Sequence, residues 1–224
     1  MHRRLIRFYE TESGALMDVL ILISAWIFYF ILHSVLASLI TKQWVAKRWP
    51  HFMPAYRLGF NLVAILLLAP IFWLMHSHVW PSVWQWQGVA KLLANIVTVL
   101  AVIGFIWSLK YYDLQEFMGF RQWRAHVTQP EDQEHLQISP LHRFVRHPWY
   151  FFAIVILWSR DLDLAQFILS ALGTLYFIIG SRMEEQKLLV YHGDRYRRYQ
   201  QRVPGLFPLP WKFLSKADAK LLAK

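Results

Sequence analysis

Residues 19–41 read VLILISAWIFYFILHSVLASLIT and contain no Asp, Glu, Lys or Arg. Three further runs share this property, at residues 58–90, 92–109 and 164–181. A helix needs about 20 apolar residues to cross the hydrocarbon core of a bilayer. The four runs therefore predict an all-α, polytopic integral membrane protein.

The composition of the chain supports this class. The 224 residues are 56% hydrophobic and only 17% charged, whereas soluble domains carry about 25% charged residues. The net charge of +10 comes from Lys and Arg that lie mainly at the ends of the apolar runs, which indicates membrane topology rather than nucleic-acid binding. The chain has no cysteine, and this excludes disulfides, thiolate metal sites, iron–sulfur clusters and a cysteine nucleophile of its own.

We expect about five transmembrane helices in two regions. The first region is residues 1–109, and its three spans are expected at residues 19–40, 58–75 and 92–109. The second region is residues 110–224, with a tight helical hairpin over residues 148–181 between two polar segments. The first arm of the hairpin, residues 148–159, is short for a ~30 Å core, so we expect flanking residues or neighbouring helices to shelter it.

Positive charge alternates between the loops. Lys and Arg number four in residues 41–57, one in 76–91, five in 110–147, one at the 160 turn and ten from Arg182 onward. Because cytoplasmic loops collect Lys and Arg, both large polar segments are predicted to face the cytoplasm of a bacterial inner membrane, with the N-terminus outside. The loop at residues 76–90 carries three tryptophans and is predicted to lie at the outer interface.

The cytoplasmic segment ends in Arg146-His147-Pro148-Trp149-Tyr150, where apolar sequence resumes. Proline is favoured at the first helical position, so His147 is the expected N-cap and Tyr150 lies on the same helical face. The other arm of the hairpin leaves the membrane on the same side at Glu184 and Glu185. The two ends together offer partners for a ligand that carries an ammonium group and a carboxylate.

These motifs resemble the isoprenylcysteine carboxyl methyltransferase family. The run RHPWY, the Glu184–Glu185 pair and the stretch HGDRYRRYQQRVPGLFP occur in the same order as in that family, over about residues 132–208. The family also includes membrane phospholipid N-methyltransferases and methanethiol S-methyltransferases. Upstream, residues 33–38 and 119–122 are more similar to the methanethiol-methylating branch.

The resemblance implies a five-span enzyme that binds S-adenosylmethionine without a Rossmann domain, with residues 110–224 as the cofactor-binding region. The cofactor contacts that it implies are Glu134, His135, Leu136, Gln137, His142, His147, Pro148, Trp149, Tyr150 and Glu184. Arg146, Arg182 and Glu185, at the same mouth of the hairpin, are the predicted catalytic residues. Two positions depart from the family pattern: Phe152 replaces a usual glycine, and Gly180 replaces an arginine of the prenylcysteine branch.

The acceptor stays open between a small thiol and an isoprenylcysteine carboxylate. His33 and Asn61 are candidate groups on the acceptor side, or they hydrogen-bond a neighbouring helix instead. Each motif taken singly also has a structural interpretation, as topology-setting Arg and His or as a solvated Glu pair. A transporter or scaffold would show charges at mid-membrane. A haem or metal protein would need its histidines on the same side of the membrane. We therefore expect an enzyme with lipid contacts, without a metal and without a nucleic-acid partner.

Overall fold

The computed structural model describes the backbone of residues 2–130, 136 and 138–223, with the side-chain surroundings of those from Gly14 to Leu222. Two short strands, β1 (Ser82–Trp84) and β2 (Leu162–Asp163), accompany an otherwise helical chain. The helices are α1 (His2–Ala37), α2 (Leu39–Arg48), η1 (Pro50–Ala55), α3 (Tyr56–Ser77), α4 (Gly88–Ser108), η2 (Leu109–Tyr111), α5 (Leu114–Met118), α6 (Phe120–Arg124), η3 (Leu141–Arg143), α7 (Pro148–Trp158), α8 (Leu164–Arg202) and α9 (Lys216–Ala223).

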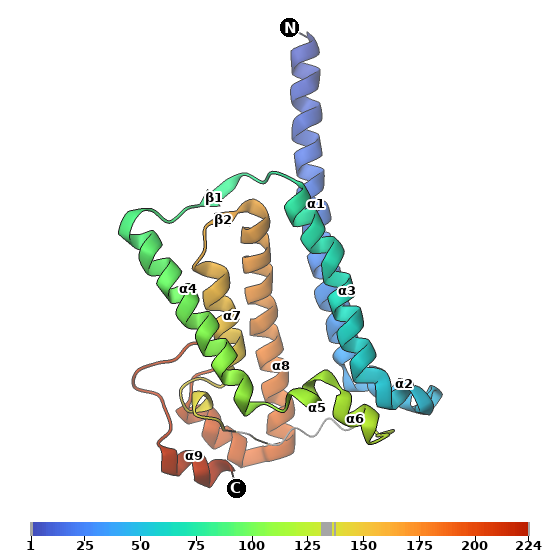
Figure 1. Ribbon diagram of the computed structural model, residues 1–224, viewed down its shortest axis with the longest axis vertical. Helices are drawn as coiled ribbons and strands as arrows, with labels where there is room; N and C mark the ends of the chain where they lie inside the picture. The colour runs from blue at the N-terminus through green and yellow to red at the C-terminus, as the bar shows by residue number, and fades with distance from the viewer. Residues whose placement is uncertain (1, 131–135, 137, 224) are drawn as a thin grey trace.

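Four described segments are long and apolar enough to cross a membrane, and they are Gly14–Ala37, Pro50–Ser77, Gly88–Tyr111 and Leu164–Arg202. The fifth expected span is α7, whose eleven residues cover about 16 Å. α7 and α8 form the predicted hairpin (Figure 1). The prediction of an all-α, polytopic membrane protein is confirmed.

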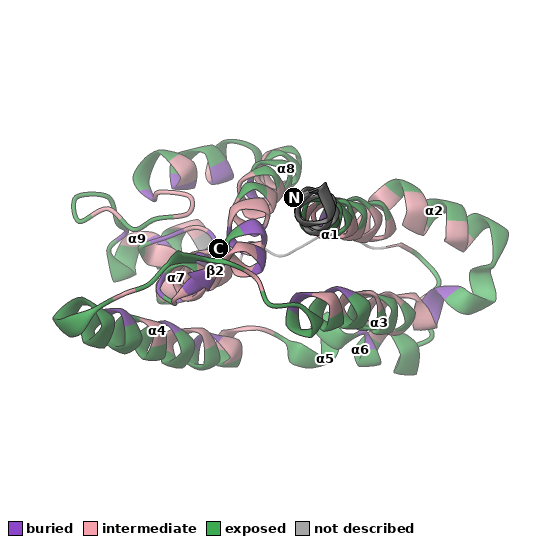
Figure 2. Ribbon diagram, turned by 90° about the horizontal axis from the view of Figure 1, so that it is seen from above, coloured by how far each residue is buried: buried purple, intermediate pink, exposed green. Residues whose placement is uncertain are grey.

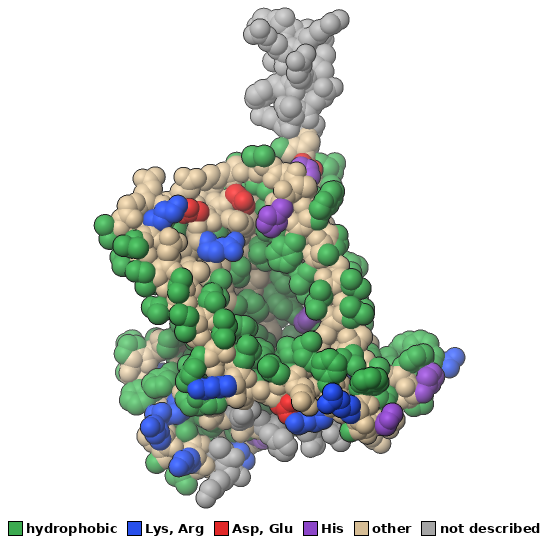
Figure 3. Space-filling model, viewed as in Figure 1, with side chains coloured by type: hydrophobic (Ala, Val, Ile, Leu, Met, Phe, Trp, Pro, Cys, Tyr) green, Lys and Arg blue, Asp and Glu red, His purple; other side chains and the backbone are tan. Residues whose placement is uncertain are grey.

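The long helices pack in a series. α3 packs against α1, α1 against α8, α8 against α7 and α7 against α4, as Figure 2 shows from above. α2, α5, α6 and α9 gather at one end of the bundle, which we call the polar end (Figure 1). Hydrophobic side chains cover the flank of the molecule, and Lys and Arg concentrate at the polar end (Figure 3). An apolar surface of this extent is suited to lipid rather than water.

At the end opposite the polar end, the strands β1 and β2 pair antiparallel. Asp161 accepts a hydrogen bond from the backbone N–H of Trp86 at 2.9 Å, and it forms an ion pair with Lys91 at 2.8 Å. The N–H of Leu164 donates to the carbonyl of Pro81 at 2.9 Å. The tryptophan-rich loop thus supplies backbone partners to the turn of the hairpin, a pairing that its composition does not reveal.

Phe152 marks the contact between α4 and α7. A Cβ at Gly104 of α4 would lie 2.6 Å from Cζ of Phe152, which is far inside contact distance. The small residue at this crossing therefore lies on α4, while the large one lies on α7 at the position where the family usually has glycine. The close contact between α4 and α7 is thus made by Gly104 against the Phe152 ring.

We expect Gly104→Ala to lower the free energy of unfolding by about 1–3 kcal/mol, because an extra methyl group must displace a packed ring. Gly59→Ala in α3 is the matched control, since a Cβ there meets nothing within 4 Å. Melting temperatures of the detergent-purified variants compare the two. Equal melting temperatures for both variants would contradict this account of the α4–α7 contact.

The end of α8 turns back beneath the hairpin. Gly193 has φ 51° and ψ −130°, so the 39-residue helix breaks at this point. The following turns bring Tyr196 and Tyr199 into a buried cluster with Val203 and Leu214. Beyond the helix, the backbone N–H groups of Arg146 and His147 donate to the carbonyls of residues 204 and 205 at 2.9 and 3.1 Å. These two hydrogen bonds hold the segment before α7 against the C-terminal tail.

Candidate active site at the polar end of the hairpin

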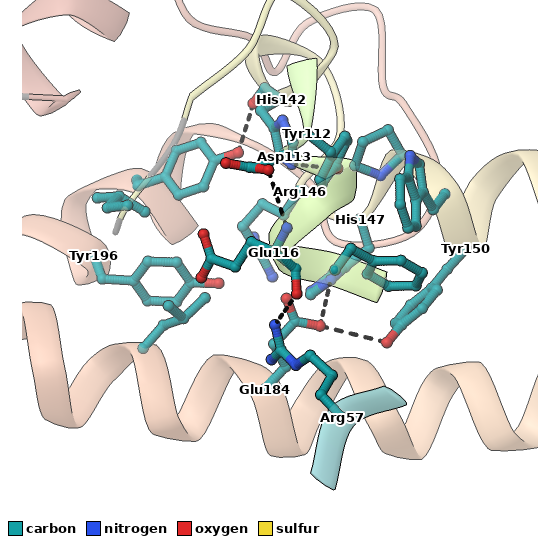
Figure 4. Close-up of a pocket in the computed structure, with 16 residues that line it drawn as sticks. Arg57, Tyr112, Asp113, Glu116, His142, Arg146, His147, Tyr150, Glu184 and Tyr196 are labelled. Carbon is teal, nitrogen blue, oxygen red and sulfur yellow. Dashed lines mark hydrogen bonds and ion pairs between the residues drawn. The ribbon is translucent and has the colours of Figure 1, made fainter. Parts of the chain in front are cut away.

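A cavity of about 420 Å³ opens beside the start of α7 (Figure 4). Its volume falls within the range of small-molecule sites. The residues around it come from α3, the segment after α4, η3, α7 and both parts of α8. They are Arg57, Tyr112, Asp113, Glu116, Phe117, Leu136, His142, Arg146, His147, Pro148, Trp149, Tyr150, Glu184, Leu188, Tyr196 and Tyr199.

The start of α7 and the middle of α8 meet in this cavity. His147 is the N-cap residue of α7, with proline at the first helical position. Its ring stacks on that of Tyr150, with centroids 5.4 Å apart and planes 8° from parallel. Glu184 lies 3.4 Å from Nδ1 of His147 and accepts a hydrogen bond from the Tyr150 hydroxyl at 3.5 Å (Figure 4). The predicted convergence of the two hairpin ends is therefore present in the structure.

Next to these side chains lies a buried ion cluster of Arg146, His147 and Glu185. One carboxylate oxygen of Glu185 lies 2.8 Å from Nε of Arg146, 2.7 Å from Nη2 of Arg146 and 2.9 Å from Nε2 of His147. The other oxygen accepts from the Gln200 side chain at 2.9 Å. Arg146 also donates to the carbonyls of Gln200 and Val203. Glu185 does not line the cavity, so it positions the two residues that do.

The charge state of His147 follows from this cluster. Burial favours the neutral imidazole, but hydrogen bonds to Glu184 and Glu185 and their negative charges outweigh it and raise the pKa of His147 to about 9. The ring is therefore a cation at neutral pH. It can attract an anion, but it cannot act as a base there.

This raised pKa predicts a loss of stability in alkali. The unfolded histidine has a pKa of about 6.5, so the stabilisation is complete below about pH 6.5 and disappears as the pH rises through about 9. The melting temperature should therefore fall from about pH 6.5 to about pH 9.5. The slope should be smaller in His147→Gln, and equal slopes would show that another group is responsible.

His142 lines the same cavity in a different state. Its Nδ1 lies 2.7 Å from the Ser139 hydroxyl and its Nε2 lies 3.2 Å from the Tyr112 hydroxyl. Burial, helped by the positive charge of His147 and opposed by Glu184, lowers the pKa of His142 to about 4. The two histidines therefore differ in charge at neutral pH, although both line one cavity.

Aromatic rings form the wall around Trp149. The Tyr112 ring lies 4.2 Å from the Trp149 ring, and the Phe117 ring packs edge-on at 5.5 Å. The indole N–H of Trp149 donates to the buried Ser108 hydroxyl at 2.8 Å, which fixes the ring against the end of α4. This wall can stack on a flat ring or face a cation.

The N-terminal region holds the α5 wall of the cavity. Arg57 donates to the carbonyl of Glu116 at 2.9 Å, and the Asn61 side chain donates to those of Phe117 and Met118 at 3.2 and 3.1 Å. The final carbonyls of a helix have no partner within it, and α3 supplies partners here. The cavity therefore depends on both predicted regions of the chain, and Asn61 bonds a neighbouring element rather than standing free.

The sequence-predicted residues fall into three sets. Those that line the cavity are Leu136, His142, Arg146, His147, Pro148, Trp149, Tyr150 and Glu184. Arg182 is exposed and does not line it, and Glu185 lies behind it. The predictions for Glu134, His135 and Gln137 lie outside the described residues.

Several cavity residues were not predicted from the sequence. Arg57, Asp113 and Glu116 carry no local motif, and Tyr112 follows an apolar span without any distinguishing spacing. Tyr196 and Tyr199 are spaced at a helical interval in the stretch HGDRYRRYQQRVPGLFP. This spacing was the one sequence signal that could have assigned them to the site. His33 is not among the residues that line the cavity; its Nδ1 lies 2.9 Å from the Tyr176 hydroxyl of α8.

Curated proteins similar to this chain share one named activity. Methanethiol S-methyltransferase 1 of Bradyrhizobium diazoefficiens is 29% identical over 217 residues, which cover 90% of this chain and 70% of that protein. The methanethiol S-methyltransferase of Mycobacterium tuberculosis is 30% identical, with 80% and 73% covered. That of Pseudomonas deceptionensis is 26% identical, with 86% and 72% covered. No family model and no solved structure matches the chain.

The helical membrane fold, the charged cavity and these relatives together define a membrane-embedded methyltransferase. The chain belongs to the methanethiol S-methyltransferase family, as its 30% identity to two curated members over most of their length shows. The resemblance stated from the RHPWY and Glu-Glu motifs is thereby confirmed. The transporter and haem alternatives are not favoured, and the described residues contain no cluster of three or more metal-ligating side chains.

Proposed function

We propose that the protein transfers a methyl group from S-adenosylmethionine to a small thiol of the methanethiol type. The observation that carries the proposal is the 420 Å³ cavity in which Glu184, a cationic His147 and an aromatic wall face one another. The acceptor class is taken from the names of the relatives. When bound, S-adenosylmethionine supplies an electrophilic methyl group on a sulfonium centre.

The residues of the cavity suit the functional groups of this donor. Glu184, 38% exposed at its side chain, can accept hydrogen bonds from an ammonium group. Arg146 and His147 offer positive charge for a carboxylate, next to the N-terminus of α7. The Trp149 ring can stack on an adenine. The ammonium, the carboxylate and the adenine of the donor thus each have a partner of the right kind.

Methyl transfer from a sulfonium is an in-line displacement, so the protein must mainly align two partners and exclude water. No covalent intermediate on the chain is needed, which agrees with its lack of cysteine. The cationic His147 and Arg57 are the cavity residues that can attract a thiolate. Below its pKa a thiol is mostly protonated, and only a few per cent of a cysteine-like thiol is thiolate at pH 7.

The test is turnover of the detergent-purified protein with labelled donor and three acceptors: methanethiol, a farnesylcysteine analogue and phosphatidylethanolamine. We expect methylation of methanethiol and no comparable methylation of the other two acceptors. Activity on the farnesyl analogue or the phospholipid alone would reject the thiol as acceptor and leave the methyltransferase class standing.

We further propose that the protein lies in a bacterial inner membrane with the cavity facing the cytoplasm. The alternation of Lys and Arg between the loops supports this orientation. Since the chain lacks cysteine, Ser215→Cys at the polar end and Val83→Cys in β1 provide two single labelling sites. A membrane-impermeant thiol reagent added to intact cells should label Val83→Cys and spare Ser215→Cys, and the reverse pattern would overturn the orientation.

A further inference from the structure

A thiol acceptor must lose its proton when it is methylated, and the cavity must provide a way out for that proton. This requirement rests on the proposed function. The histidine beside Glu184 cannot serve, because His147 already carries a proton at neutral pH. Glu184 is engaged by His147 and Tyr150, and the two other carboxylates that line the cavity, Asp113 and Glu116, are both paired with Arg121. The opposite side of the cavity therefore has to be considered.

On that side three side chains form a continuous hydrogen-bonded row. The Tyr112 hydroxyl lies 3.2 Å from Nε2 of His142, and Nδ1 of His142 lies 2.7 Å from the Ser139 hydroxyl. Tyr112 and His142 both line the cavity, across from Glu184 (Figure 4). Ser139 is buried just behind them. The row thus begins at the cavity wall and leads away from it through two groups that can each accept and donate a proton.

We propose that Tyr112, His142 and Ser139 form a proton relay that removes the proton of the acceptor thiol. Tyr112 is the catalytic residue that contacts the acceptor, while His142 and Ser139 carry the proton onward. The relay requires the resting tautomer in which Nδ1–H of His142 donates to Ser139 and Nε2 accepts from the Tyr112 hydroxyl.

The step balances without an additional reagent. The S–H bond of the thiol breaks and an S–CH₃ bond forms, while the methyl–sulfonium bond of the donor breaks and its electron pair stays on the donor sulfur. The thiol proton passes to the Tyr112 oxygen, and the former hydroxyl proton of Tyr112 passes to Nε2 of His142. The Nδ1 proton leaves through Ser139 to water, so the three side chains return to neutral forms with the tautomer of His142 exchanged.

The surroundings keep His142 in the neutral form that a relay needs. The charged groups that act on it are His147, which opposes a second positive charge, and Glu184, which favours one; burial favours the neutral ring. The other groups against it are the Tyr112 and Tyr199 hydroxyls, and the latter donates to the His142 carbonyl at 2.6 Å. A ring whose pKa lies near 4 does not retain the proton, which suits a group that must pass it on.

The experiment compares two acceptors with Tyr112→Phe: an alkanethiol, which is protonated at pH 7.5, and an electron-poor arenethiol, which is already ionised. With the alkanethiol, turnover should fall about 100-fold, the size expected for a lost proton-transfer group. With the arenethiol, turnover should stay within about two-fold, because no proton has to leave. Tyr111→Phe is the matched control, since the neighbouring tyrosine does not line the cavity, and it should leave both rates unchanged.

A second variant and a binding measurement keep the test decisive. His142→Gln preserves a hydrogen-bonding amide but cannot pass a proton, and it should show the same difference between the two thiols. Calorimetry with S-adenosylhomocysteine should give affinities for Tyr112→Phe within about two-fold of the wild type, a difference of less than about 0.5 kcal/mol. Equal losses with both thiols, or a matching loss of affinity, would show that Tyr112 acts by shape or donor binding and would overturn the relay. A wild-type protein that methylates neither thiol would reject the proposed function itself.

Discussion

Glu185→Gln is expected to lower the free energy of unfolding by about 3–5 kcal/mol, the usual effect of removing one partner from a buried ion pair. The side chains of Arg146 and Glu185 are only 13% and 14% exposed, and His147 is 4% exposed. Removing the carboxylate leaves two cations facing each other without a shared anion. The measurement is the midpoint of denaturant or thermal unfolding of the detergent-purified protein.

Asp194→Asn provides the matched control for this prediction. Asp194 pairs with Arg197 at 3.5 Å in the same helix, but the two side chains are 83% and 67% exposed. Loss of such a pair changes stability by less than about 1 kcal/mol. If both substitutions shifted the unfolding midpoint equally, the buried ion cluster of Arg146, His147 and Glu185 would not be a major contributor to the free energy of unfolding.

Glu184→Gln is expected to weaken binding of S-adenosylmethionine by about ten-fold or more, since a hydrogen bond to a charged group contributes about 1.5–3 kcal/mol. The substitution keeps the shape of the side chain and removes its charge. Glu184 is more exposed than Glu185, so its loss should affect affinity more than folding. Calorimetry on the folded variant, with its melting temperature recorded in parallel, separates the two effects.

Arg182→Gln is the control for the donor prediction. Arg182 lies half a turn of α8 from Glu184, and sequence motifs alone implied a catalytic role for it, but its side chain is exposed and away from the cavity. Its substitution should leave donor affinity within about two-fold. Unchanged affinity in Glu184→Gln, or a ten-fold loss in Arg182→Gln, would place the donor site elsewhere.

The hairpin and its paired motifs were predictable because the information is local. An apolar run shows where a helix crosses the membrane, and a proline at its start fixes the N-cap, so His147, Tyr150 and Glu184 could be assigned to one end. The helical period of the tail likewise relates Tyr196 to Tyr199. In each case residues close in sequence, or the ends of one hairpin, determine the geometry.

The remaining parts of the site depend on contacts distant in sequence. Tyr112 lies 30 positions from His142, and Asn61 lies 56 positions from Phe117. Neither contact follows from hydrophobic period or capping. The outcome for Arg182 has a simpler cause: residues two positions apart on a helix do not share a face, so Arg182 points away from the side on which Glu184 lies.

The strand pairing at the tip of the hairpin has a consequence for folding. α7 ends at Trp158, and the Ser159 hydroxyl lies 2.6 Å from that of Thr98, ten residues into α4. The chain then runs as non-helical backbone, whose N–H and C=O groups need hydrogen-bond partners. The partners come from residues 81–86. The tip of the hairpin therefore takes its final structure only when the loop between α3 and α4 is in place beside it.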